Sequence, residues 1–397
     1  MPKRDFTERE KEMSARNYGQ RELELLRQVL ASGKLSSLAG GEFTPEFEKE
    51  FAKAIGTKYA IAMNSCMSAL HVAVMCAGAG AGTEVICDPE YIFGAEAALY
   101  NNAIPVFVDI DPVTHNMNPD GIEATITERT RAIIATHAWG LPAEIDRIVE
   151  IGHRHNLVVI EDCAESILAT YKGRCTGNWG DIGCFSFQAS KQMSLGDGGM
   201  ATTNNEEFAE KLGENAGAPT SGSVAFGVHY GYRMTEPIAA IGLAQLESLP
   251  QYIRFLKKNA DYYDQAVEEC NWLRLQRGPD EADHTFYHWA ATFEGEEYGI
   301  GLDDFKKAVE KTNVSSISIG YTRMPAYQHP LIRDRAAHAF HCSSYKGDRD
   351  HYPEGLCPIA ERVIPRIVLA YVIEPEEMAK REAEKLHQVI EQLEKRA

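Results

Sequence analysis

The stretch that decides the expected fold reads CFSFQASKQMSLGDGGM, residues 184–200. An apolar run opens it, Lys191 follows, and a glycine-rich turn closes it. Upstream, LVVIED at residues 157–162 is a second apolar run, and it ends in Asp162. Both runs are typical of buried strands. Because ligands collect at the carboxyl ends of parallel strands, we expect Lys191 and Asp162 to share one site.

Strand and helix patterns alternate from this stretch back to the N-terminal part of the chain. Helices are expected at Ser68–Ala77 and Glu144–His155, and the spacing of Phe43, Phe47, Phe51 and Ile55 indicates another. The alternation predicts an α/β fold with a mostly parallel sheet that is covered on both faces. The strand-like runs are Glu84–Cys87, Pro105–Ile110, Ala132–Thr136, Val158–Glu161 and Ile182–Phe187.

The pattern changes after about residue 250, which predicts two domains. We expect a large α/β domain at 1–250, with an N-terminal helical segment, and a smaller α+β domain at 251–397. The segment Ser318–His351, rich in Tyr, His, Arg and Pro, indicates a long loop. The other elements expected here are helices at Thr235–Leu249, Tyr252–Glu269 and, after Pro375, Glu376–Lys395, and a strand at Thr285–Phe293.

Charge and hydropathy narrow the range of partners. The formal net charge is −18, so the chain repels nucleic acid and we expect no such partner. No apolar run reaches the roughly 18 residues of a membrane span. The N-terminal run Met1–Phe6 is polar and lacks the apolar core of a secretory signal. We therefore expect a cytoplasmic protein without a membrane partner.

The cysteines indicate reduced thiols. There are nine, an odd number, and no two of them form a C-x-x-C pair. This pattern favours free thiols over a disulfide framework or a zinc site. We expect no metal.

Lys191 and Asp162 are the two groups that an enzyme needs to hold pyridoxal phosphate. The lysine amine can form a Schiff base with the cofactor, and a buried carboxylate can keep the pyridine nitrogen protonated. Since the Schiff base needs a neutral amine, we expect a site that lowers the pKa of Lys191. Taken singly, Lys191 could be a surface lysine and Asp162 a helix cap. Their combination favours the cofactor.

A place for the cofactor's phosphate is predicted at NSCMSALH, residues 64–71. This small polar run opens an apolar helix, and phosphate binds the N–H groups of a helix start. Simple N-capping of the helix would use the same residues, and both interpretations stay open.

Many short motifs along the chain together carry a family resemblance. They are SGKL (32–35), FEKEF (47–51), NSCMSAL (64–70), PVFVD (105–109), HAWGLPA (137–143), EDCAE (161–165), residues 186–199, YRMTE (232–236), AAIGLAQL (239–246) and CPIAE (357–361). With these motifs the chain resembles the DegT/DnrJ/StrS aminotransferases, which use pyridoxal phosphate to aminate keto-sugars and related rings. The resemblance implies transferase fold type I, with a mostly parallel sheet of the seven-stranded type, and a homodimer whose active sites are shared.

The resemblance also implies the role of single residues. Lys191 matches the Schiff-base lysine and Asp162 the partner of the pyridine nitrogen. Glu165 matches the residue near the ring hydroxyl, and Ser186 a phosphate-binding serine. The remaining matches are Met67 and Ser68, whose backbone amides would bind the phosphate, and Phe93, which would stack on the ring, with Tyr91 as the alternative.

Three positions depart from the family pattern. Met67 stands where Thr is usual, so a hydroxyl contact to the phosphate is lost. Gly231 replaces an Asn that reaches the neighbouring subunit's phosphate. Ile92 replaces the Thr before the stacking aromatic residue. Because all three lie near the ring or the subunit boundary, they indicate an unusual fit of cofactor and substrate.

Candidate contacts to the substrate come from two segments. In the predicted long loop they are Tyr321, Arg323, Tyr327 and His329, which could equally face solvent. From the neighbouring subunit they are His229, Tyr230 and Arg233. His137 is interpreted as a histidine of the core or of the surroundings of the site.

The resemblance implies an aminotransferase that works by ping-pong kinetics. An amino-acid donor, Glu or Gln, would leave its amino group as pyridoxamine phosphate, and a keto-sugar or ketocyclitol would accept it. Lys191 would serve as general base. Two alternatives stay open: a pyridoxal-phosphate-dependent sugar dehydratase, against which Lys191 argues because that class carries His there, and a regulatory member that binds the cofactor without turnover.

Overall fold

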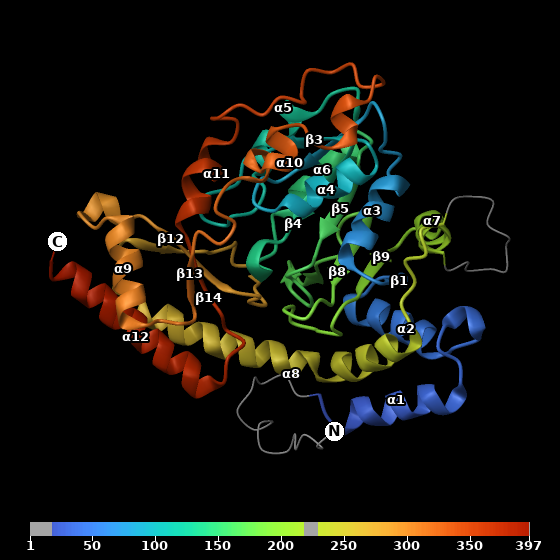
Figure 1. Cartoon of the computed structure of the whole chain (residues 1–397), viewed down its shortest axis with the longest axis horizontal. Helices are drawn as coiled ribbons and strands as arrows, with labels where there is room; N and C mark the ends of the chain where they lie inside the picture. The colour runs from blue at the N-terminus through green and yellow to red at the C-terminus, as the bar shows by residue number, and fades with distance from the viewer. Residues whose placement is uncertain (1–17, 218–228, 397) are drawn as a thin grey trace.

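A seven-stranded sheet forms the centre of the protein in its computed structural model, which describes residues 18–217 and 229–396 (Figure 1). The order of the strands is β1-β9-β8-β5-β4-β2-β3. Only β9 runs antiparallel to its neighbours in this sheet, so the expected mostly parallel sheet is confirmed. The strands are β1 Tyr59–Met63, β2 Glu84–Cys87, β3 Ile104–Phe107, β4 Thr130–Thr136, β5 Val158–Asp162, β8 Ile182–Ser186 and β9 Gly199–Thr203.

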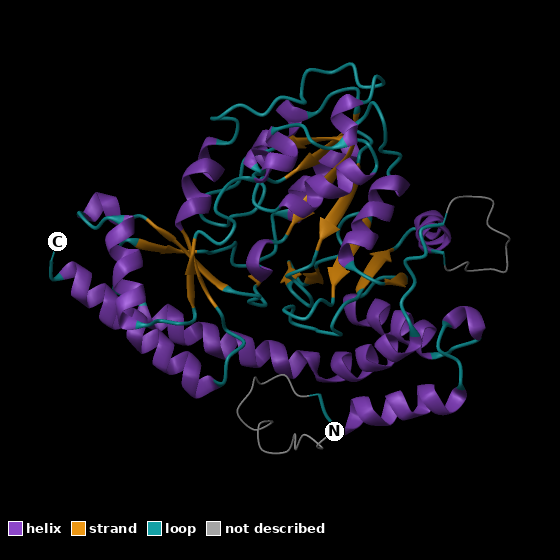
Figure 2. Ribbon diagram, viewed as in Figure 1, coloured by secondary structure: helices purple, strands orange, loops and turns teal. Residues whose placement is uncertain are grey.

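Helices cover both faces of this sheet (Figure 2). Successive side chains of β5 alternate between the faces: Ile160 packs in the apolar cluster below α3, and Val159 in the cluster below α6. Ile148 and Ile151 of α6 recur at helical spacing and face Val159. On the first face lie α3 Cys66–Cys76, α4 Ile92–Tyr100 and α7 Glu206–Ala216, and on the second α2 Phe43–Ile55 and α6 Ile145–Arg154.

A second, antiparallel sheet of four strands lies in the C-terminal part, in the order β10-β12-β14-β13. It packs with α9 Leu302–Thr312 and α12 Glu376–Glu394. A three-stranded sheet, β11-β6-β7, joins the loops of the two parts. The strands are β6 Thr170–Tyr171, β7 Arg174–Cys175, β10 Leu273–Leu275, β11 Ala282–Asp283, β12 Trp289–Phe293, β13 Ile317–Ile319 and β14 Ile367–Ala370.

The expectation of two separate helices on either side of residue 250 is wrong. One helix, α8 Glu236–Ala266, runs through Pro250 (Figure 1). Proline removes one backbone donor from a helix. Here α1 Gln20–Ser32, α2 and α12 pack along α8, and buried side chains such as Leu249 and Ile253 hold it on both sides of the proline. Since α8 crosses residue 250, the proposed boundary between domains stays a prediction.

The predicted loop at 318–351 is a winding segment with short helices that returns to the large sheet. Its Tyr345 hydroxyl donates to Glu84 of β2 (2.9 Å), and the Tyr352 hydroxyl to the carbonyl of Pro105 in β3 (2.8 Å). These contacts lie at the amino ends of β2 and β3, whereas the N–H of Ala326 donates to the carbonyl of Pro89, beyond the carboxyl end of β2, where the site is expected. Its short helices are η6 Ala326–Gln328, α10 Pro330–Arg333 and η7 His338–His341, and α11 Pro358–Val363 follows.

Three further findings bear on the predictions. All nine cysteines lie among the described residues as free thiols. No helix in the described part of the chain combines the length and apolar character that crossing a membrane requires. The N-terminal run Met1–Phe6 lies outside the described residues.

Candidate active site

A cavity of about 550 Å³ opens at the carboxyl ends of the central strands. Asp162 ends β5, Ser186 ends β8, and Lys191 lies in the loop that follows β8. The fold thus brings Lys191 and Asp162 into one site. The predicted residues that line the cavity are Met67, Tyr91, Phe93, Asp162, Glu165, Ser186, Lys191, Tyr321 and His329.

Lys191 is held at the cavity wall by a carboxylate and an aromatic ring. Its Nζ donates to Glu165 Oε1 at 3.1 Å and lies 4.0 Å from the centre of the Tyr287 ring. The Tyr287 hydroxyl in turn lies 3.0 Å from Ser190 Oγ. These contacts point the amine into the cavity, where a cofactor or substrate could reach it.

The expectation of a site that lowers the pKa of Lys191 is wrong. Burial acts in that direction, but the charges of Glu165 and Tyr287 outweigh it, and the pKa of Lys191 lies above its usual value. The neutral amine that a Schiff base needs is therefore disfavoured while Glu165 contacts Nζ.

Asp162 is a buried carboxyl with few hydrogen-bond donors among the residues that the structure describes. Only 3% of its surface is exposed, and Oδ1 accepts the N–H of Ala164 at 3.0 Å. Burial raises the pKa of Asp162 to about 6, although the Ala164 N–H and the nearby Lys191 act to lower it. A cationic group placed in the cavity beside Asp162 would favour its charged form.

Glu165 joins three parts of the chain at the site. Its Oε2 accepts the Tyr91 hydroxyl at 2.9 Å and the Trp139 N–H at 3.0 Å, while Oε1 faces Lys191. Trp139 has a φ of 61°, which is uncommon for a residue other than glycine and presents its N–H to the carboxylate. This carboxylate is thereby fixed between Lys191 and the aromatic residues.

The start of α3 forms another wall of the cavity. Ser65 caps this helix, and its Oγ accepts the Ser68 N–H at 3.1 Å. Ser65 and Met67 line the cavity, whereas the Ser68 side chain bonds Asn64 (2.6 Å). A Cβ on Gly199 would lie 2.3 Å from Ser65, so only glycine lets β9 approach this turn. A phosphate here would bind the backbone N–H of Met67 more readily than that of Ser68, because the Ser68 N–H already donates to Ser65 Oγ.

Two aromatic residues remain as candidates for stacking. Phe93, in the first turn of α4, is 47% exposed at the edge of the cavity. Tyr91 is buried, and its hydroxyl is already bonded to Glu165. Phe93 therefore offers a free ring face, while Tyr91 is a fixed part of the wall.

Two of the four loop residues predicted for the substrate do not line the cavity. Tyr327 is fully buried against Phe107 at 5.4 Å between ring centres, and its hydroxyl donates to Glu361. It is a core residue, so its assignment to the substrate is wrong. Arg323 is exposed with a φ of 63°, outside the residues that form the cavity.

The residues assigned to a neighbouring subunit are not among those that line this cavity in the same chain. His229 donates from Nδ1 to the carbonyl of Glu214 (2.8 Å), and Arg233 donates to the carbonyl of Gly217 (2.9 Å). Tyr230 stacks on Tyr232 at 5.4 Å. Their role toward a neighbouring subunit stays a prediction.

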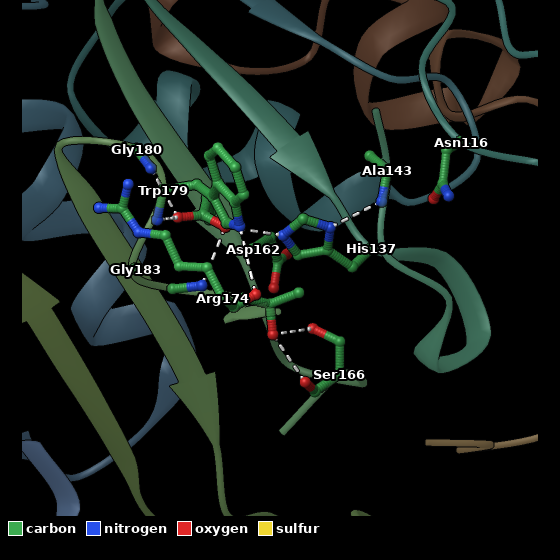
Figure 3. Close-up of polar contacts among 12 residues, drawn as sticks. Asn116, His137, Ala143, Asp162, Ser166, Arg174, Trp179, Gly180 and Gly183 are labelled. Carbon is green, nitrogen blue, oxygen red and sulfur yellow. Dashed lines mark hydrogen bonds and ion pairs between the residues drawn. The ribbon is translucent and has the colours of Figure 1, made fainter. Parts of the chain in front are cut away.

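His137 belongs to a buried network on the other face of β5 (Figure 3). Its Nδ1 accepts the Ala143 N–H, so Nε2 carries the proton and donates to Glu161 Oε2, each at 3.0 Å. Glu161 also accepts the N–H groups of Gly177, Trp179 and Gly180. With Cys163 nearby, the group has the make-up of a metal site, but its imidazole and carboxylate are engaged in holding loops.

Sequence reasoning missed several residues of the cavity wall. Ser65 lies in the stretch predicted for the phosphate, and the structure shows that it is the N-cap of that helix. Glu90 and Tyr287 have no predicted role, and the packing of distant segments brings them here. Cys66, Gln188, Ser190 and Asp197 lie in the quoted stretches without a predicted role, and Thr136, Thr322, Met324 and Ala326 also line the cavity.

Comparison with known proteins gives concordant matches. A model of the DegT/DnrJ/EryC1/StrS aminotransferase family matches residues 17–350. GDP-perosamine synthase of Caulobacter vibrioides is 37% identical over 301 residues, 74% of this chain and 81% of that protein. L-glutamine:2-deoxy-scyllo-inosose aminotransferase of Streptomyces lividus is 30% identical over 331 residues, which are 79% of this chain and 76% of that protein. The solved aminotransferase of Psychrobacter cryohalolentis has a TM-score of 0.83 at 27% identity and covers 95% of this chain and 98% of its own.

Proposed function

Because the chain belongs to the DegT/DnrJ/EryC1/StrS aminotransferase family, we propose that it transfers an amino group to the carbonyl carbon of a keto-sugar or a ketocyclitol. Membership of this aminotransferase family, which the motifs predict, is confirmed. The observation that carries the proposal is the meeting of Lys191, Asp162 and Glu165 at the end of one sheet.

The residues of the cavity fit pyridoxal phosphate. Asp162 is buried with a raised pKa and a shortage of donors, which a pyridinium N–H would relieve. The start of α3, with Met67, and the nearby Ser186 suit a phosphate. Lys191 lies between these groups and Glu165. When bound, the cofactor would supply an electron sink for the substrate carbon.

The chain's own residues would then divide the work. Nζ of Lys191 takes the proton from the α-carbon of the amino-acid donor and holds it until it returns to the cofactor side. Asp162 holds the proton of the pyridine nitrogen, and Glu165 orients Nζ. Neutralising or displacing Glu165 from Nζ would allow Lys191 to act as a base, because this contact raises its pKa.

The donor and the kinetic order follow from the same proposal. The Streptomyces lividus relative is named for L-glutamine as donor, and we propose Gln or Glu for this chain. Because one cavity holds Lys191, donor and acceptor would bind in turn and give ping-pong kinetics. We also propose a homodimer, in which His229 and Arg233 contribute to the neighbouring site.

The test uses the purified holoenzyme. L-glutamine or L-glutamate should convert the visible absorbance of the lysine-bound cofactor to that of pyridoxamine phosphate. The pyridoxamine phosphate form should regain the visible band when 2-deoxy-scyllo-inosose is added. Alternatively, GDP-perosamine should act as amino donor in the reverse direction and remove the visible band of the lysine-bound form. Absence of conversion with any amino acid would leave a binding protein without turnover and refute the proposal.

A second measurement identifies the lysine. Borohydride reduction followed by peptide mass mapping should place the cofactor on Lys191, and Lys191→Ala should abolish the adduct. Lys172→Ala is the matched control, because Lys172 is a surface lysine paired with Asp146 at 2.7 Å. An unchanged adduct in Lys191→Ala would show that another lysine serves.

A further inference from the structure

Glu90 lines the cavity and has an unpartnered, buried carboxyl oxygen. Its side chain is 2% exposed and lines the same cavity as Lys191. Glu90 Oε1 accepts the Thr322 hydroxyl at 3.1 Å. Oε2 is buried and has no hydrogen-bond partner within the described residues.

The backbone around Glu90 is fixed from both sides, and the Thr322 hydroxyl holds the side chain. Asp88 Oδ1 accepts the N–H groups of Glu90 (3.0 Å) and Tyr91 (3.3 Å). The carbonyl of Pro89 accepts the N–H of Ala326 at 2.7 Å, which ties the turn to the segment that follows β13. Glu90 is therefore built into the wall between two segments of distant sequence.

An unpartnered buried carboxyl is costly, and none of the roles assigned above uses this one. Leaving a buried polar group unsatisfied costs about 1–3 kcal/mol. Glu165 accepts the hydrogen bond of Lys191 Nζ, and Asp162 is the proposed partner of the cofactor nitrogen. Thr322 contacts Glu90, and Tyr321, Met324 and His329 of the same segment line the same cavity of about 550 Å³, which has room for a ligand.

We propose that Glu90 hydrogen-bonds a ring hydroxyl of the acceptor and so helps to select polyhydroxylated rings. This inference rests on the proposed function. It places the acceptor's ring between the turn before α4 and the segment that contains Thr322, while the carbonyl carbon faces Lys191.

The charge state of Glu90 favours a hydroxyl as its partner. Burial raises the pKa of Glu90 to about 8, Thr322 acts to lower it, and Asp88 and Glu165 raise it further. Near neutral pH the carboxyl is thus mostly protonated. Since Oε1 accepts from Thr322, the proton lies on Oε2, where it can be donated to a hydroxyl oxygen.

The experiment separates donor from acceptor chemistry in the holoenzyme. Glu90→Leu should leave the rate of the half-reaction with L-glutamine unchanged and raise KM by about tenfold or more for 2-deoxy-scyllo-inosose or GDP-perosamine, whichever the wild type converts faster. Glu90→Gln keeps a donor and an acceptor, so its KM should stay within about threefold. Thr322→Val is the control for a merely anchoring role, and should raise KM much less than Glu90→Leu.

Four outcomes would overturn the inference. An unchanged KM in Glu90→Leu means that Glu90 does not meet the acceptor. An equal loss in Glu90→Gln means that an ionised carboxylate binds a cationic group instead. If Thr322→Val matches Glu90→Leu, Glu90 only anchors the segment. If the wild type reacts with L-glutamine but with neither ring compound, the proposed acceptor is wrong, and this inference is wrong as well.

Discussion

Glu161 and Asp162 are neighbours at the end of β5, and both are buried, yet their surroundings differ. Glu161 faces the α6 side and accepts four donors: the N–H groups of Gly177, Trp179 and Gly180, and Nε2–H of His137 (Figure 3). Asp162 faces the cavity and accepts the N–H of Ala164. Alternation along a strand is what sends the two carboxyls to opposite faces.

The difference separates a carboxylate that holds the fold from one that is available to a ligand. Glu161 accepts hydrogen bonds from His137 and from the N–H groups of a neighbouring loop, and these bonds fix that loop. Asp162 is left short of donors, and burial raises its pKa to about 6. Stability and function thus use adjacent residues of one strand for opposite purposes, and substitutions should separate them.

Asp162→Asn should give the largest effect on activity. If Asp162 holds the pyridine nitrogen as proposed, Asn leaves the protonated nitrogen without a counter-charge, and we expect the rate constant of the half-reaction with L-glutamine to fall by about a hundredfold or more. Single-turnover kinetics with L-glutamine would measure it. Activity within a few-fold of wild type would mean that Asp162 does not face the cofactor nitrogen.

The same substitution should stabilise the protein without cofactor. The pKa of Asp162 is raised on folding, so wild-type stability falls as pH rises from about 4 to about 6, by roughly 3 kcal/mol in all. Asp162→Asn lacks this loss. Its Tm should exceed that of wild type at pH 7.5 and match it near pH 4, in thermal unfolding of the apoprotein.

Glu161→Gln should lower the stability and leave the activity little changed, the reverse of what we expect for Asp162→Asn. The amide cannot accept from all four donors, and breaking such a buried cluster costs on the order of 3–5 kcal/mol. We expect a lower urea midpoint, with kcat of the folded fraction little changed. Equal stability of Glu161→Gln and wild type would remove the contrast with Asp162.

Tyr327→Phe should give the smallest effect. It removes the hydroxyl that donates to Glu361 and accepts the Cys357 N–H (3.2 Å), at a cost of about 1–2 kcal/mol. Because Tyr327 is fully buried, acceptor KM should not change. A raised KM with unchanged Tm would restore the substrate role that the sequence predicted for it.

Local pattern predicted the elements of the large sheet well. Apolar runs fall on β2, β4, β5 and β8 because a parallel sheet buries both faces of its strands. The pattern failed at Pro250, since proline signals a helix end only when nothing packs across it. It failed also at 285–288, predicted as strand, where bonds to Trp139 and Gly140 turn the chain and bring Tyr287 to the cavity.

The sequence by itself determined the family, the sheet and the meeting of Lys191 with Asp162, because strand ends and a lysine loop are local features that parallel topology brings together. Only the tertiary structure decided which neighbours those groups have. Glu165 reaches Lys191 and raises its pKa, Tyr327 turns into the core, and Glu90 is fixed at the wall by a segment far along the chain. Side-chain surroundings depend on contacts between distant segments, and no local pattern encodes them.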